Sequence, residues 1–106
     1  MIPCTCIDDK NRPADFPLNR WVKEGDKYRI TALYICLPQN VLGYSIYEKP
    51  CTEDCYPYQY FLSTRFSVTK EAAQQLLQML KDQAESLSDE QIKQLFKNSN
   101  VEVAQQ

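Results

Sequence analysis

Five cysteines give this 106-residue chain its clearest potential for metal chemistry. Cys51 and Cys55 are separated by three residues, a spacing found in structural zinc sites. Cys4 and Cys6 would point to the same face of a strand, so these four thiols could form one zinc site. In the interpretation we favour, Cys4, Cys6 and Cys36 are instead small buried side chains in strands. Cys51 and Cys55 then flank an exposed loop.

Histidine is absent from the chain, which removes many catalytic schemes. Ser-His-Asp and Cys-His catalysis, an imidazole general base and histidine-containing zinc sites are excluded. Asp8, Asp9 and Asp15 form an acidic cluster, but adjacent residues at a strand end point apart and aspartate is a common turn residue. No cysteine falls at a predicted helix N-terminus, where a thiolate would be stabilised. We therefore predict a protein with no enzymatic activity and no cofactor.

A run of tyrosines around Pro57 is the most distinctive candidate for a binding surface. Tyr56, Tyr58 and Tyr60 alternate through it, and tyrosine is a rigid, amphipathic side chain favoured at recognition surfaces. Trp21, between two charged turns, could lie in the same surface. We predict that these four residues bind a protein partner. The competing interpretation is that Tyr60 and Trp21 fill the core while Tyr56 and Tyr58 cover one edge.

Basic residues among the tyrosines suggest an alternative partner. Arg20, Lys27 and Arg29 could contact the phosphates of a nucleotide or nucleic acid while tyrosines stack on its bases. However, Glu24 and Asp26 interrupt this basic segment. The chain also carries 12 basic against 14 acidic residues, and its pI is about 5.1, which argues against a module with a basic surface. Nucleic-acid binding is therefore the second hypothesis.

The composition changes near residue 68, which divides the chain into a β-rich body and a helical tail. Residues 1–68 hold all six prolines and both glycines, whereas eight of the ten glutamines follow. Alternating apolar residues and turn clusters predict four strands. They are expected at 2–7, 28–35, 42–46 and 61–68. A bulge or two-sided burial is expected at 33–35, where the alternation breaks.

Two helices are predicted in the tail, over 69–98. Thr69 is the expected N-cap of the first, and Ser88 with Gln91 forms a capping box for the second. The apolar stripe of the first helix either covers one end of the body or serves a second copy of the chain. A monomer and a homodimer through these helices both remain open. Residues 99–106 are expected to fray.

Several short segments resemble one family of small proteins. These segments are 6–9 (CIDD), 21–30 (WVKEGDKYRI), 43–48 (GYSIYE), 60–61 (YF) and 65–66 (RF). Together they cover about residues 4–68 and resemble an uncharacterised family with an SH3-like pattern, found in gut bacteria, their prophages and phages. We therefore expect an α+β fold: a small SH3-like antiparallel β-barrel or bent sheet, followed by two C-terminal α-helices.

The family has no established activity, so the resemblance implies a phage or mobile-element context rather than a chemistry. We expect a non-catalytic protein-binding or adaptor module. It could be an inhibitor of a host protein or a virion accessory protein. The first residues lack a basic segment and an apolar segment, and no run reaches about 18 apolar residues. The expected location is therefore the cytoplasm, or the virion of a phage, without a membrane partner.

Overall fold

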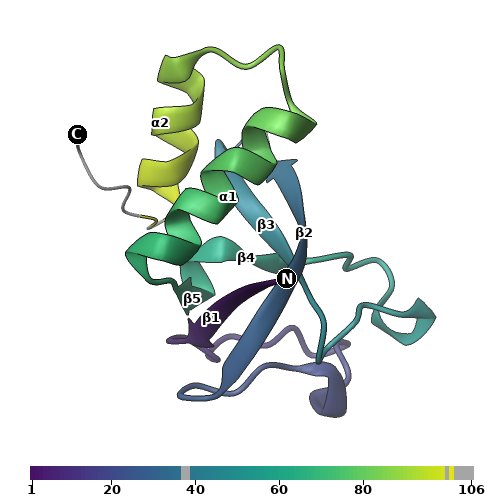
Figure 1. Ribbon diagram of the computed structural model, residues 1–106. Helices are drawn as coiled ribbons and strands as arrows, with labels where there is room; N and C mark the ends of the chain where they lie inside the picture. The colour runs from purple at the N-terminus through teal and green to yellow at the C-terminus, as the bar shows by residue number, and fades with distance from the viewer. Residues whose placement is uncertain (37–38, 100, 102–106) are drawn as a thin grey trace.

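The computed structural model describes residues 1–36, 39–99 and 101, which form an antiparallel sheet followed by two helices (Figure 1). The predicted α+β class is therefore confirmed. The strands are β1 (Ile2–Cys6), β2 (Lys27–Cys36), β3 (Val41–Ile46), β4 (Phe61–Leu62) and β5 (Phe66–Ser67). The helices are α1 (Lys70–Gln83) and α2 (Asp89–Asn98), and single 3-10 turns occur at η1 (Leu18–Arg20), η2 (Glu53–Cys55) and η3 (Ser63–Arg65).

The sheet is bent and open. Its strand order is β4-β3-β2-β1-β5, so β4 and β5 are its two edges. Only the three residues of η3 connect these edges, which requires the sheet to curve until they lie near each other. Among the described residues no ladder joins β4 to β5. Of the two predicted forms, the bent sheet is therefore correct and the closed barrel is not.

The predicted strand over 61–68 is interrupted. Between β4 and β5 the backbone turns through η3, because long-range contacts hold Arg65 in this turn. The Arg65 carbonyl accepts hydrogen bonds from the amides of Ile7 and Asp8, at 2.7 and 3.3 Å. Its guanidinium donates to the Lys10 carbonyl at 2.7 Å. A single continuous strand would break these contacts.

A β-bulge in β2 explains the irregular alternation of its sequence. The pairing with β3 shifts register between Ile30 and Ala32, slightly earlier than predicted. Tyr28 and Ile30 face the core before the bulge, and Leu33 and Ile35 face it afterwards. The bulge therefore keeps both halves of a ten-residue strand packed on one core.

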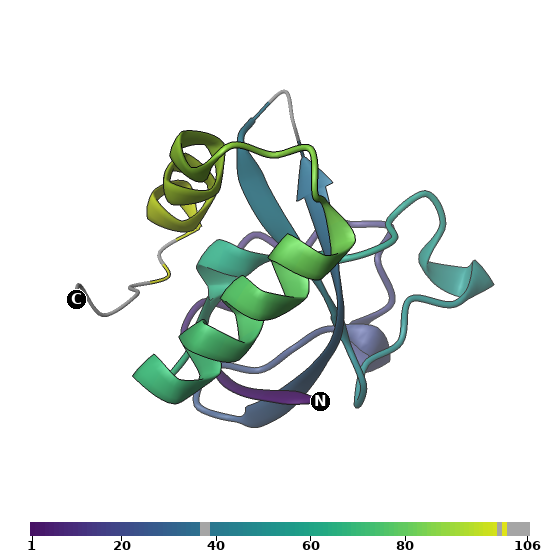
Figure 2. The ribbon, with the colours of Figure 1, turned by 45° about the horizontal axis from the view of Figure 1, so that its top comes forward.

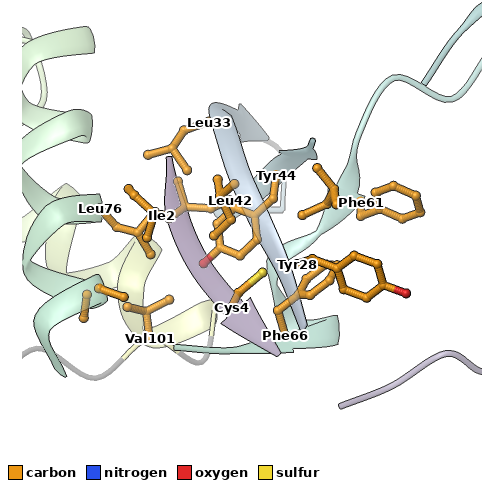
Figure 3. Close-up of a cluster of buried hydrophobic side chains, with 14 of the residues drawn as sticks. Ile2, Cys4, Tyr28, Leu33, Leu42, Tyr44, Phe61, Phe66, Leu76 and Val101 are labelled. Carbon is orange, nitrogen blue, oxygen red and sulfur yellow. The ribbon is translucent and has the colours of Figure 1, made fainter. Parts of the chain in front are cut away.

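The core fills the space between the sheet and the two helices. Tyr44 is fully buried at its centre, and its ring contacts Phe66 with the centroids 5.8 Å apart. Figure 3 shows Leu76 and Val101 approaching from the helical side, with Phe61 on the other. Thr69 caps α1, and Ser88 forms the predicted capping box of α2. Neither described helix is long and apolar enough to cross a lipid bilayer.

The tail is fastened to the start of β3. Ser99 is fully buried, and its hydroxyl accepts a hydrogen bond from the Leu42 amide at 2.8 Å. The Asn98 side chain donates to the Asn40 carbonyl at 2.8 Å. Val101 is also buried, so the expectation of fraying is wrong for Ser99 and Val101. Residues 100 and 102–106 lie outside the described residues.

Both helices use their apolar stripes within the chain. The side chains buried by α1 are Ala72, Ala73, Leu76 and Leu80, and those buried by α2 are Ile92, Leu95 and Phe96. α1 packs against β1, and α2 packs against β3. This is the covering arrangement predicted for a monomer. The homodimer stays a prediction.

Candidate functional site

Two long connections lie side by side on the side of the sheet away from the helices (Figures 1 and 2). The first, 7–26, joins β1 to β2, and the second, 47–60, joins β3 to β4. An ion pair between Arg20 and Asp54, at 3.3 Å, links them. The Tyr58 hydroxyl also donates to a carboxylate oxygen of Asp15 at 3.3 Å. Residues far apart in sequence therefore form one surface.

An aromatic hollow of about 170 Å³ lies where these connections meet β4. It is lined by Pro13, Phe16, Trp21, Tyr58, Tyr60, Phe61, Leu62 and Arg65. A second hollow adjoins it and shares three of these residues as its wall. The second hollow is lined by Pro57, Tyr58, Gln59, Tyr60 and Leu62. We call the two hollows together the aromatic groove.

Trp21 forms a fixed wall of the groove. Its indole nitrogen donates to the Asp9 carbonyl at 2.6 Å. Its ring packs against Phe16 and Phe61, with centroid distances of 5.2 and 5.7 Å. The Arg65 guanidinium lies 4.7 Å from its centroid, within the range of a cation–π contact. These contacts hold the ring in one orientation before any ligand arrives.

Tyr58 and Tyr60 separate the two hollows. Tyr58 packs against Phe16, with the ring centroids 5.7 Å apart. Loss of surrounding water and the nearby Asp15 carboxylate raise the pKa of Tyr58. The hydrogen bond with the Cys36 thiol, at 2.8 Å, raises the pKa of Tyr60. Both phenols are therefore neutral near pH 7, and they present uncharged aromatic surface to a ligand.

Gly43 makes room for Tyr60. A Cβ atom on Gly43 would lie 2.8 Å from Cγ of the Tyr60 ring, closer than carbon atoms pack. Tyr34, which pairs with Gly43 across β2 and β3, stacks on Tyr60 with the centroids 5.2 Å apart. The bare glycine and the stacked tyrosine together determine where the Tyr60 ring lies.

Three of the four predicted partner-binding residues meet in the groove. Trp21, Tyr58 and Tyr60 line it, whereas Tyr56 is absent from the lining of both hollows and 80% exposed. Sequence reasoning missed Pro13, Phe16, Leu62 and Arg65. The signal available for Phe16 was an aromatic residue inside a proline-containing turn segment, but nothing local indicated its contact with Tyr58.

Two of the three basic residues of the alternative hypothesis are paired with carboxylates. Arg20 pairs with Asp54, and Arg29 pairs with Glu48 at 2.7 Å. The hydrogen bonds from Arg29 lower the pKa of Glu48 against the effect of its burial. Lys27 is exposed at the start of β2. The two arginines are therefore engaged with carboxylates rather than free to bind phosphate.

The cysteines are not gathered at one place. Cys4 and Cys6 lie in β1 and, like Cys36 in β2, are buried as predicted. Cys51 and Cys55 flank an exposed stretch, 52–54, as predicted, although Cys55 itself is fully buried and Cys51 is half-buried. η2 turns Cys55 inward against the core. All five are free thiols. Within the described ranges no three potential metal ligands cluster, so the four thiols of the zinc alternative do not come together.

Comparisons with known proteins add no relative: no family model, curated protein or solved structure matches this chain.

Proposed function

We propose that this chain is a non-catalytic binding module whose aromatic groove receives an extended, proline-bearing segment of a protein partner. The observation that carries the proposal is the adjoining pair of hollows divided by Tyr58 and Tyr60. A polyproline II segment presents a proline or aliphatic side chain at regular intervals, and aromatic-lined grooves bind such segments.

The rigidity of the groove supports this function. Trp21 and Tyr58 already have hydrogen-bond partners at Asp9 and Asp15, so ligand binding does not need to order them. Preorganised aromatic side chains lose little conformational entropy on binding. A polyproline II peptide is itself stiff. Both sides of the proposed complex therefore have little freedom to lose.

Trp21 provides a direct test because it is the only tryptophan of the chain. Its fluorescence should change on titration with a synthetic decapeptide of alternating proline and leucine. A glycine-serine decapeptide of the same length should cause no change. Saturable binding to the first peptide alone supports the groove, and no response to either peptide overturns the proposed function.

A tyrosine series locates the binding surface. Tyr58→Ala should weaken peptide binding about tenfold or more, because truncation of a central aromatic contact commonly has that effect. Tyr47→Ala is the matched control: Tyr47 is 55% exposed and lies under Arg29 instead of in the groove. Tyr56→Ala should change binding less than twofold, since it is outside the groove lining. Equal losses in all three variants would contradict the proposal.

A further inference from the structure

A third hollow, lined by charged residues, adjoins the aromatic groove across Trp21. It encloses about 550 Å³, and Trp21 lines both it and the aromatic hollow. Its charged lining residues are Asp9, Arg12, Lys23, Asp26 and Lys49. A peptide that lies along the aromatic groove and passes Trp21 therefore enters a polar environment.

The three cations of this charged hollow lack carboxylate partners. The ion pairs of the described residues involve Arg20, Arg29 and Arg65 instead. Arg12 donates to the carbonyls of Pro13 and Phe16. Lys49 donates to the Asn19 carbonyl at 3.1 Å. Lys23 is exposed. Neutral carbonyls hold two of the cations in place without cancelling their charge.

The two acidic residues of the hollow do not balance these cations. Asp9 accepts a hydrogen bond from the Glu24 amide at 3.0 Å, so one of its carboxylate oxygens is already engaged. Asp26 is exposed. Three cations against two carboxylates leave the charged hollow with a net charge of about +1. A ligand group entering it meets an excess of positive charge.

We propose that the segment bound by this chain carries an acidic side chain next to its proline-bearing stretch, and that its carboxylate binds in the charged hollow beside Lys23. This inference rests on the proposed function and adds the charge of the partner to it. A single excess charge suits one or two carboxylates. A phosphate backbone would need several free cations along its length, and Arg20 and Arg29 are already paired.

Peptides that differ only in end charge test the inference. The proline-leucine decapeptide is extended by two glutamates, two lysines or two glutamines, at each terminus in turn. When the extension is at one of the two termini, the glutamate peptide should bind about fivefold more tightly than the glutamine peptide, as expected for an exposed ion pair. The lysine peptide extended at the same terminus should bind more weakly than the glutamine peptide. This preference should diminish at 0.5 M salt because exposed charges are screened.

A charge reversal assigns the effect to the hollow. Lys23→Glu should remove or invert the preference for glutamate, with the glutamine peptide bound as before. Lys93→Glu, the same charge change on an exposed residue of α2, is the matched control and should leave the preference intact.

The outcomes separate the two proposals. If no peptide binds, the proposed function fails. If the peptides bind equally whatever their end charge, or the lysine peptide binds best, the groove stands and this inference is overturned. A single-stranded oligonucleotide that binds more tightly than the glutamate peptide, and loses affinity in Lys23→Glu, would overturn it in favour of a nucleic-acid partner.

Discussion

The missing side chain of Gly43 determines where a tyrosine of the groove lies. Tyr60 covers the bare backbone of Gly43 and stacks on Tyr34 from the neighbouring strand. A ring placed over a strand glycine protects backbone that would otherwise be exposed. The position of Tyr60 therefore depends on β3 as well as on its own connection.

Gly43→Ala should displace the Tyr60 ring. We expect the free energy of unfolding to fall by about 1–3 kcal/mol, as for other overpacked sites, and peptide binding to weaken with it. Urea denaturation and the Trp21 titration measure the two effects. Ser45→Ala, on the same strand, should change neither appreciably. An unchanged affinity in Gly43→Ala would show that the groove does not need this placement of Tyr60.

Cys51 is the one cysteine that is not fully enclosed, yet it should react slowly. Burial, with a smaller effect from neighbouring Cys55, raises the pKa of its thiol from 9.0 to about 11. At pH 8 this lowers the thiolate fraction about 100-fold, and the thiolate is the reactive form. Iodoacetamide should therefore label Cys51 about 100-fold more slowly in the folded chain than in the urea-unfolded chain, as followed by mass spectrometry of the peptide that contains it. Rapid labelling of Cys51 in the folded chain would contradict this.

At the scale of elements, a buried hydrogen bond adds to the apolar packing that holds the helical tail to the sheet. β4 pairs with β3 only at Gly43 and Tyr44. The Ser99 hydroxyl instead accepts the hydrogen bond of the Leu42 amide. The end of α2 thus satisfies a backbone group that the short edge strand does not reach.

Ser99→Ala should leave the Leu42 amide buried without a partner. The expected loss is about 1–3 kcal/mol in the free energy of unfolding. Ser86→Ala, an exposed serine between the helices, should change stability by less than about 0.5 kcal/mol. Hydrogen exchange of the Leu42 amide should accelerate in Ser99→Ala beyond the change in global stability. Unchanged exchange would show that this hydrogen bond does not fasten the tail.

Elements whose signals are local could be predicted from sequence. Thr69 and Ser88 cap their helices as expected because a cap is decided within four residues. The strand over 61–68 was mispredicted because Arg65 is held by Ile7 and Asp8, which are distant in sequence. The broken alternation in β2 did indicate its bulge.

The groove shows the same difference between local signals and contacts that are distant in sequence. Residue type alone indicated Trp21, Tyr58 and Tyr60, but their convergence depends on long-range packing around Phe16. The burial of Cys55 has a related cause: η2 turns its thiol into the core, although the residues before it, 52–54, are exposed. The pairing of arginines with carboxylates likewise depends on the folded chain.

At the scale of the whole molecule, the core contains ionisable groups that must remain neutral. Burial raises the pKa of the Cys4 thiol to about 12, with a smaller effect from Glu48. Burial likewise raises the pKa of Tyr44 well above its ordinary value. Both side chains lie in the single core shared by the sheet and the helices (Figure 3). Ionisation of either would place a charge where the chain has no means to solvate it.

The chain should therefore lose stability in alkali. In the unfolded chain Cys4 ionises near pH 9, whereas the folded chain holds its proton until about pH 12. Over this interval the folded state binds more protons, so the free energy of unfolding falls as the pH rises, by at most about 1.4 kcal/mol per pH unit for one group. Urea denaturation at pH 8, 9, 10 and 11 measures the decline.

Cys4→Ala should be less stable at pH 8 because it leaves a cavity, but its stability should decline less steeply above pH 9. Parallel declines in both proteins would mean that Cys4 does not ionise on unfolding in this range.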